Sequence, residues 1–369
     1  MSHRPTVALV DLEAIRHNVG VLKPERAEVM AVVKANGYGH GSVPVARAAL
    51  SAGASWHGVA LVEEGIELRD AGITGPILVL SEFPPGSEKE ALAAGLVPSL
   101  YTEDGLHRLA EAAGSLGRRV GVHVKVDTGM HRVGIDTDQV APLVARLLDS
   151  GLELEGLWTH FAKSEETDDP FTSVQLDRFN RVAAIMREGR VVPRYLHAAN
   201  SAAVMTRPDS HLDMVRLGIA MYGLCPGPTL PADACSTLRP AMSFKSAVTM
   251  VKRVPAGEAI SYGQHYTLER PSTMATVPVG YADGYSRLLS GKAEVLIRGR
   301  RCPVAGTVTM DQLMVDCGDD PIETGDEVVL IGRQGDERIT ADALAGWMGT
   351  ISYEVVCGLS QRVPREYVG

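Results

Sequence analysis

Cysteine is scarce in this sequence of 369 residues. Its five cysteines are an odd number, and no two of them form a Cys-x-x-Cys pair. Scattered thiols of this kind are typical of reduced, buried side chains in a cytosolic protein, and they argue against a disulfide framework or a zinc site. We therefore expect all five to be reduced, namely Cys225, Cys235, Cys302, Cys317 and Cys357.

Long apolar runs and an excess of positive charge are also missing. No run approaches the roughly 18 apolar residues that a membrane span needs, and Asp11 stands where a signal peptide would continue its apolar core. The net charge is −9, from 36 Lys and Arg against 45 Asp and Glu, which disfavours binding to nucleic acid or to anionic lipid. We expect a soluble, cytoplasmic protein without nucleic-acid or membrane partners, although backbone N–H groups can still bind a phosphate.

Lysine is the third scarce residue, and one lysine stands out by its position. The lysines are Lys23, Lys34, Lys89, Lys125, Lys163, Lys245, Lys252 and Lys292. Lys34 directly follows an apolar, β-branched run, so its side chain either reaches from a strand end into solvent or is an amine that reacts with the carbonyl group of a cofactor or substrate. The neighbouring Gly37, Gly39 and Gly41 favour the second interpretation, because glycine lets the backbone approach a ligand closely.

The first two-thirds of the chain alternates short β-branched runs with amphipathic helical segments, which is the pattern of βαβ units. Eight strands are expected, at residues 28–34, 56–62, 76–81, 96–101, 120–127, 152–161, 191–199 and 214–218. Eight is the number of strands that closes a (β/α)8 barrel. A doubly wound open sheet is the alternative, but the turn after the first expected strand, at residues 34–41, lacks the G-x-G-x-x-G sequence of dinucleotide-binding folds.

The composition changes near residues 226–240, where Pro, Gly and small polar residues are typical of a linker. Short β-rich runs follow at residues 246–254, 273–278, 293–297, 312–316 and 327–331, with one late helix near residues 340–348. We therefore expect an α/β protein with two domains. The first is an N-terminal (β/α)8 TIM-type barrel over residues 1–235, and the second is a smaller, mostly β domain over residues 236–369.

Reactive side chains gather at the ends of the expected strands, where the catalytic groups of a barrel lie. They are Lys34, Lys125, Arg132, His160, His197, Asn200, Ser201 and Arg216. The histidines show no metal-ligand spacing, and no His-x-x-x-His sequence occurs. We therefore expect no metal site.

Eight segments resemble, in the same order, the motifs of the alanine racemase family. They are AVVKANGYGHG (31–41), KVDTGMHRVG (125–134), HAANS (197–201), VRLGIAMYG (215–223), SYGQHY (261–266), PVGYADG (278–284), MDQ (310–312) and ISYE (351–354). The resemblance extends from about Val10 to Pro364. It implies a pyridoxal-phosphate barrel whose C-terminal domain completes the partner subunit's active site in a homodimer. It also implies an isomerase that interconverts L- and D-alanine and supplies D-alanine for cell-wall peptidoglycan.

The resemblance implies two bases, because racemisation needs a proton acceptor on each face of the α-carbon. Lys34 matches the residue that binds the cofactor covalently and then acts as one base, and Tyr262 matches the second base. A phenol is a weak base near neutrality unless nearby cations stabilise its anion, and His160 and Arg216 match the family's relay beside that tyrosine. Arg216 also matches the arginine that faces the pyridine nitrogen, and His197 is expected beneath the ring.

The resemblance further implies a phosphate site without a basic surface. Its members are the side chains of Tyr38, Ser201 and Tyr353 and the backbone N–H groups of Gly218 and Ile219. Hydroxyls and backbone donors can hold a phosphate together, so the negative net charge is compatible with this cofactor.

Substrate contacts are implied for Arg132 and for the backbone of Met310, which matches a residue of the partner subunit, with Asp311 as its supporting neighbour. Lys125 matches a position that is carbamylated in many relatives, where it orients the arginine. Tyr281 and Tyr353 resemble the ring-lined entrance, which favours small side chains.

One segment departs from the family pattern. Relatives commonly have an arginine and a cysteine shortly before the MDQ sequence, and this chain has Thr307 and Thr309 in that segment. We expect the electrostatics of the entrance, the dimer contacts and the sensitivity to inhibitors to differ as a result.

Three alternatives remain open. A racemase of broader specificity, acting for example on serine, is the closest. A non-catalytic pyridoxal-phosphate carrier would need Lys34 and the phosphate site but neither Tyr262 nor Met310. A related decarboxylase with a barrel and a β domain would not need bases on opposite faces.

Overall fold

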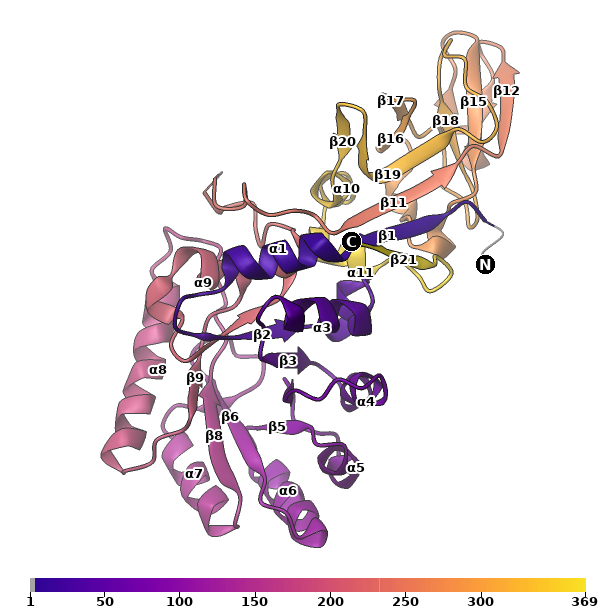
Figure 1. Cartoon of the computed structure of the whole chain (residues 1–369). Coiled ribbons are helices and arrows are strands. Elements are labelled where there is room, and N and C mark those ends of the chain that lie inside the picture. The colour runs from indigo at the N-terminus through magenta and orange to yellow at the C-terminus, as the bar shows by residue number, and fades with distance from the viewer. Residues whose placement is uncertain (1–3, 232) are drawn as a thin grey trace. The chain divides into compact units, whose positions relative to one another are not determined.

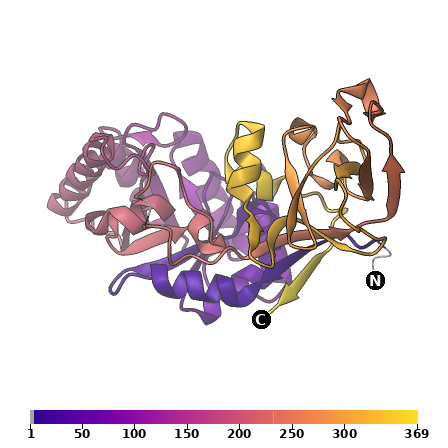
Figure 2. The same ribbon diagram turned by 90° about the horizontal axis from the view of Figure 1, so that it is seen from above.

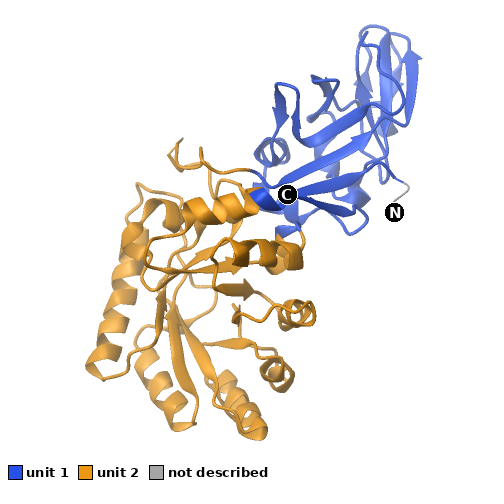
Figure 3. Ribbon diagram, viewed as in Figure 1, with its two compact units in different colours: residues 1–13, 38–40, 240–369 blue, residues 14–37, 41–239 orange. Residues whose placement is uncertain are grey.

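The computed structural model describes residues 4–231 and 233–369. The chain divides into two compact units (Figure 3). Unit 1 contains Met1–Glu13, Tyr38–His40 and Pro240–Gly369, and unit 2 contains Ala14–Gly37 and Gly41–Arg239. The beginning of the chain therefore belongs to the same unit as its end. None of the described helices combines the length and apolar character that a bilayer crossing requires.

Unit 2 is a nearly closed barrel of eight parallel strands (Figure 1). The strands are β2 (Glu28–Val32), β3 (Trp56–Val59), β4 (Ile77–Val79), β5 (Val97–Leu100), β6 (Gly121–Asp127), β8 (Glu153–Trp158), β9 (Tyr195–His197) and β10 (Met214–Leu217). They pair in the order β10-β2-β3-β4-β5-β6-β8-β9, and the short β7 (Ile135–Asp136) pairs with β6. Backbone hydrogen bonds of 3.0 Å from Asp213 to Leu196 and from Arg216 to Ala199 bring β10 beside β9. All eight predicted strands are present, and the predicted fold class is confirmed.

Helices alternate with these strands and cover the outside of the barrel (Figure 1). They are α1 (Leu12–Leu22), α3 (Ser42–Ser51), α4 (Val62–Asp70), α5 (Glu88–Ala93), α6 (Glu103–Leu116), α7 (Val140–Asp149), α8 (Phe171–Glu188) and α9 (Ser201–Thr206). The sequence of α6 shows why such a segment is helical. Thr102 caps it by accepting a bond from the N–H of Gly105, and Leu106 and Leu109 share its buried face. Gly117 ends it in the left-handed conformation.

The barrel interior changes from apolar to polar along the strands. Met30, Trp56, Leu78, Tyr195 and Met214 form an apolar cluster. Because every second residue of a strand points to the same side, the next inward positions on β9 and β10 are the polar residues His197 and Arg216. The strands thus place an apolar layer under a polar layer at their carboxyl ends.

Unit 1 is mostly β, as predicted, and its main sheet has the order β17-β16-β19-β11-β1-β21. These strands are β1 (Val7–Asp11), β11 (Met242–Ala247), β16 (Glu294–Ile297), β17 (Arg300–Pro303), β19 (Glu327–Gln334) and β21 (Arg365–Val368), and β20 (Glu337–Ile339) pairs with β19. β1 pairs in parallel with β21, so the first and the last strand of the described chain lie side by side (Figures 1 and 2). A second sheet contains β12 (Met250–Val254), β15 (Ser272–Val277) and β18 (Leu313–Asp316).

Shorter elements complete unit 1: the hairpin of β13 (Ala259–Ile260) and β14 (Tyr266–Thr267), and the helices α10 (Ala341–Met348) and α11 (Ser352–Cys357). The predicted late helix corresponds to α10, with Thr340 as its cap. The single β run predicted at residues 246–254 is wrong. β11 ends at Ala247, β12 begins at Met250, and the two strands belong to different sheets.

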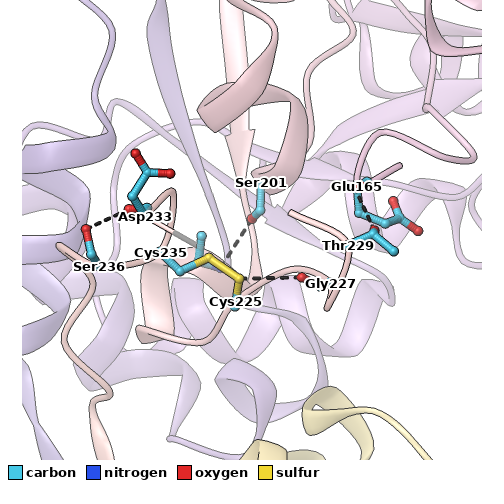
Figure 4. Close-up of a disulfide and its surroundings, with 9 residues drawn as sticks. Glu165, Ser201, Cys225, Gly227, Thr229, Asp233, Cys235 and Ser236 are labelled. Atoms are coloured by element: carbon cyan, nitrogen blue, oxygen red, sulfur yellow. Dashed lines mark hydrogen bonds between the residues drawn. A yellow bond between two sulfur atoms is a disulfide. The ribbon is translucent and has the colours of Figure 1, made fainter. Parts of the chain in front are cut away.

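The prediction of five reduced, buried cysteines is also wrong. Cys225 and Cys235 form a disulfide in unit 2 (Figure 4), because the intervening segment folds back and brings their Cα atoms to 5.6 Å, within the range of a disulfide. Cys302 and Cys317 are reduced and buried, whereas Cys357 is reduced but exposed. A separation of ten residues carries no sequence signal for this pairing.

Candidate active site

Lys34 lies in an unusual backbone turn that follows β2. The next three residues, Ala35, Asn36 and Gly37, have φ angles of 53°, 53° and 60°, so the α2 segment (Lys34–Tyr38) is a left-handed turn. Such a conformation costs roughly 1–2 kcal/mol for each residue other than glycine. The carboxylate of Glu64 accepts a 2.6 Å hydrogen bond from the N–H of Ala35 and so helps to hold the turn. Strain of this kind concentrates at functional sites.

Arg216 is the centre of a buried polar cluster at the carboxyl end of the barrel strands. Its side chain is only 3% exposed. Nη1 donates to Nδ1 of His197 at 3.0 Å, and Nη2 lies 3.2 Å from Nδ1 of His160. Nη2 also donates to the carbonyl oxygens of Thr159 and Ala198 at 2.7 and 2.8 Å. No ion pair of the described residues includes Arg216, so its charge is balanced by neutral acceptors alone.

The buried cation determines the charge of its neighbours. Burial lowers the pKa of Arg216 to about 9, which still leaves the guanidinium charged at neutral pH. The pKa values of His160 and His197 lie well below 6.5, first because both rings are buried and then because Arg216 repels a second positive charge. Both imidazoles are therefore neutral.

Lys125 lies in the same cluster on β6. Its side chain is buried, and its Nζ lies 4.3 Å from the centroid of the Trp158 ring. Burial lowers the pKa of Lys125 to about 7, and the positive charges of Arg132 and Arg216 act in the same direction. Arg132 itself is exposed. A lysine in this position carries an uncharged amine in a substantial fraction of molecules at neutral pH.

Ser201 lies at the start of α9 (Figure 4). Its Oγ accepts hydrogen bonds from the backbone N–H groups of Gly218 at 2.9 Å and Ala220 at 3.3 Å. The buried Ile219 lies between them. The Asn200 side chain accepts a bond from the α9 backbone and holds this end of the helix. A hydroxyl and converging amides can together bind a phosphate.

Tyr38 and Tyr353 lie together in unit 1, with ring centroids 6.3 Å apart. The reason is the close approach of α11 to Gly39, where a Cβ atom would lie 2.1 Å from the carbonyl oxygen of Val356. The close approach of Gly39 in the structure is thus to the backbone of α11, whereas the sequence predicted an approach to a ligand.

The remaining predicted residues lie on exposed loops of unit 1. Tyr262 is 74% exposed and Met310 is 52% exposed. The N–H of Tyr281 donates to Thr309 O at 3.0 Å, which joins the entrance segment to the MDQ segment. Asp311 accepts a bond of 2.8 Å from Arg362. Lys125, His197, Ser201 and Arg216 of unit 2 are thus buried, whereas Tyr262, Tyr281, Met310 and Asp311 of unit 1 are exposed.

Family models and known proteins match almost the whole chain. Residues 10–226 match "Alanine racemase, N-terminal domain", and residues 241–367 match "Alanine racemase, C-terminal domain". The chain belongs to the alanine racemase family. The alanine racemase of Symbiobacterium thermophilum is 53% identical over 99% of this chain and 98% of its own length.

Solved structures lead to the same family. The alanine racemase from D-cycloserine-producing Streptomyces lavendulae is 41% identical and superimposes with a TM-score of 0.94 over 100% of this chain and 98% of that chain. The Bacillus anthracis enzyme with bound L-Ala-P is 39% identical, with a TM-score of 0.93 over 100% of this chain and 96% of that chain. The predicted family and the predicted class of enzyme, an isomerase, are confirmed.

Two residues that sequence reasoning missed support the family's segments. Trp158 stacks on His197 with ring centroids 5.6 Å apart, and its ring also contacts Nζ of Lys125. Thr307, which we noted only as the loss of a charge, donates from Oγ1 to the carbonyl of Tyr262 at 2.8 Å, and its own carbonyl accepts a 2.8 Å bond from Ser261. Only the alternation of β8 could have pointed to Trp158, and no local signal links Thr307 to Tyr262.

Proposed function

We propose that this chain interconverts L- and D-alanine with pyridoxal phosphate as cofactor, and that it acts as a cytoplasmic homodimer supplying D-alanine for cell-wall peptidoglycan. The observation that carries this proposal is the buried Arg216, whose guanidinium pairs with neutral acceptors only. A donor-only cation opposite the pyridine nitrogen cannot protonate it. The ring then withdraws electrons less strongly, which favours return of the proton to the α-carbon over transamination.

The residues of unit 2 fit pyridoxal phosphate. The cofactor, when bound, supplies a conjugated ring that delocalises negative charge from the α-carbon of an amino acid. The hydroxyl of Ser201 and the N–H groups of Gly218 and Ile219 would hold the phosphate. Lys34 would bind the aldehyde carbon, and Arg216 would donate to the ring nitrogen. In unit 1, Tyr38 and Tyr353 would add hydroxyl and ring contacts.

Two side chains would exchange the proton of the α-carbon. The amine of Lys34 removes or returns it on one face, and the phenol oxygen of Tyr262 does so on the other. The high exposure of Tyr262 and Met310 supports a role at an interface, where each would meet the active site of a second copy. We therefore propose that residues 236–369 complete the site of the partner subunit, and that His160 and Arg216 contact its tyrosine.

Arg132 and Lys125 would select the substrate's carboxylate. The buried amine of Lys125, with its pKa lowered to about 7, is uncharged often enough to attack carbon dioxide, with the released amine proton passing to solvent. The resulting carbamate would place a negative charge among three cations and orient Arg132. Tyr281, on the entrance segment, would exclude large side chains.

A chirality-resolved assay against a panel of L-amino acids tests the proposal. We expect rapid formation of D-alanine, with little D-serine and no product from larger amino acids. D-product from several amino acids at similar rates would indicate a broad-specificity racemase. No D-product from any of them would leave the carrier or the decarboxylase.

The homodimer has its own test, because the assay does not measure assembly. Sedimentation equilibrium of the cofactor-loaded protein is expected to give twice the chain mass of 39.4 kDa. A fully active monomer would contradict the proposed exchange of Tyr262 between subunits.

A further inference from the structure

A chain of three imidazoles and one guanidinium runs through the polar layer of the barrel. Nδ1 of His123 lies 3.0 Å from Nε2 of His197, and Nδ1 of His197 lies 3.0 Å from Nη1 of Arg216. Nη2 of Arg216 continues the chain to Nδ1 of His160 at 3.2 Å. His123 and His197 have no exposed surface. The sequence indicated no role for His123, which stands at the end of this series of hydrogen-bonded side chains.

The guanidinium determines the direction of every bond in the chain. Arginine has N–H donors and no acceptor, so Nδ1 of His197 accepts from Nη1. Both hydrogens of Nη2 are donated to the carbonyls of Thr159 and Ala198. Nδ1 of His160, 3.2 Å from Nη2, therefore faces a cation without an acceptor and carries its lone pair there. A neutral imidazole carries one proton, which places the proton of each ring on Nε2. His197 then donates from Nε2 to His123, whose Nδ1 must accept, and the proton of His123 also lies on Nε2.

A doubly protonated ring does not fit this arrangement. In an imidazolium at His197, Nδ1 would also carry a proton. The N–H of Nδ1 and the N–H of Arg216 Nη1 would then point at each other, and neither would have an acceptor. Burial, together with repulsion from Arg216, lowers the pKa of His123 to about 3, so this ring is neutral as well. All three rings therefore share one tautomer.

The surroundings of His123 favour the same tautomer independently. Its Nε2 atom is buried and has no hydrogen-bond partner among the described residues. The carboxylate oxygen Oε2 of Glu155 lies 4.0 Å away. A proton on Nε2 faces this acidic oxygen favourably, whereas a lone pair there would be repelled by it.

Neighbouring residues of the barrel pack closely around the His123 ring. A Cβ atom on Gly156, which faces His123 across β6 and β8, would lie 2.3 Å from the Nδ1 atom. Trp56 lies against the ring with a centroid distance of 5.2 Å, and Tyr195 stacks on it at 6.0 Å with an interplanar angle of 25°. The ring is therefore fixed in one plane, with its Nδ1 lone pair directed at His197.

We propose that Arg216 imposes the Nε2–H tautomer on His160, His197 and His123, and that His123 is a positioning residue that keeps the acceptor of His197 on the guanidinium. The tautomers follow from the hydrogen bonds among these four side chains. Their importance for racemisation rests on the proposed function. Without an acceptor at position 123, the buried N–H of His197 is unsatisfied, which costs roughly 1–3 kcal/mol. His197 would then turn away, and Arg216 would lose the acceptor of Nη1.

Neutron diffraction from crystals of the deuterated, cofactor-loaded protein tests the tautomers without any substitution. We expect deuterium on Nε2 and none on Nδ1 in each of the three histidines. Deuterium on Nδ1 of His197 or His123, whether alone or together with Nε2, would overturn the proposal. The measurement is independent of catalysis, so it remains decisive if the protein proves to have a different activity.

Two substitutions at one position test the positioning role. His123→Leu removes the acceptor, whereas His123→Gln keeps an oxygen that can accept from Nε2 of His197. We expect His123→Leu to lower kcat by about tenfold, the scale typical of residues that orient a primary ligand, with KM within about twofold of the original value. His123→Leu should also alter the absorbance spectrum of the bound cofactor. His123→Gln should recover most of the lost kcat and restore the original spectrum.

His57 provides the matched control, because it is equally buried in the barrel but bonds to the carbonyl of Ala46 outside the chain of imidazoles. His57→Leu is expected to lower the thermal unfolding temperature without changing kcat by more than about twofold. Equal kcat values in the Leu and Gln variants of His123 would reduce its role to packing and overturn the proposal. Absence of racemisation in the unaltered protein would instead refute the proposed function, and the deuterium positions would still decide the tautomers.

Discussion

The barrel and the β-rich unit present their proposed active-site residues in opposite ways. In the barrel, Lys125, His197 and Arg216 are buried and bonded to one another or packed on aromatic rings. In unit 1, Tyr262 and Met310 project from exposed loops. Burial raises the strength of electrostatic interactions and fixes side chains in place. The barrel therefore holds its own polar groups by burial and hydrogen bonding, whereas unit 1 leaves Tyr262 and Met310 largely exposed.

The largest expected effect comes from the barrel side of this comparison. Lys34→Ala removes the amine that would bind the cofactor and act as one base, so we expect racemisation to fall by at least about 10³-fold and the visible absorbance of the purified protein to disappear. Absorbance spectra and the chirality-resolved assay measure the two losses. Lys89→Ala, at an exposed position on α5, is the control and should change neither. Retained absorbance in Lys34→Ala would show that another residue holds the cofactor.

Tyr262→Phe tests the exposed side. Loss of the phenol oxygen should lower racemisation by about 10²–10⁴-fold, the usual contribution of a positioned acid or base, while the cofactor spectrum stays unchanged. Tyr367→Phe, on β21 and also exposed, is the matched control. A normal rate in Tyr262→Phe would remove this residue as a base and weaken the case for an exchange between subunits.

The burial of Lys125 in the barrel predicts that the free energy of unfolding depends on pH. Its pKa is lowered to about 7 in the folded protein from 10.5, so the unfolded chain binds more protons between these values and stability rises with pH across that window. In buffer depleted of carbon dioxide, Lys125→Met should therefore exceed the original protein in stability near pH 6 by on the order of 3 kcal/mol.

Urea unfolding at several pH values measures this difference, which should shrink as the pH rises from 7 to 10. Parallel stability curves for the two proteins would contradict the lowered pKa. Lys89→Met, whose side chain is exposed, should show no pH-dependent difference.

The smallest expected effect concerns the hydrogen bond from Thr307 that holds the segment of Tyr262. Thr307→Val keeps the shape of the side chain but removes the hydrogen bond to the Tyr262 carbonyl. We expect a loss of about 1 kcal/mol in the free energy of unfolding and a severalfold lower kcat, because the tyrosine loop is less well held. Thermal unfolding and steady-state kinetics measure both quantities. An unchanged kcat would show that the loop owes its position to other contacts.

Local patterns in the sequence predicted the barrel strands well. The β-branched runs that became β2, β6 and β10 are short, buried and separated by amphipathic helices, so each could be recognised from its own residues. Lys34 could be selected in the same way, since it ends a buried strand at the edge where barrel enzymes place their chemistry.

Contacts between distant residues could not be predicted in this way. β1 joins the sheet of unit 1 by pairing with β11 and β21, which lie more than 200 residues further along the chain. A pattern local to β1 therefore could not predict this pairing. The Cys225–Cys235 pairing depends on the path of the loop between them. No role could be assigned to His123 from the sequence, because nothing adjacent in sequence shows that its Nδ1 atom faces His197.

The sequence by itself indicated the number of strands, because that depends on periodicities local to the chain, and it indicated the family and the class of reaction through the resemblance of its motifs to a known family. The tertiary structure decided which groups are buried beside Arg216, and therefore which tautomers and charges they adopt. The physical reason is that hydrogen-bond direction and desolvation depend on neighbours in space. Those neighbours come from four different strands and loops of the barrel.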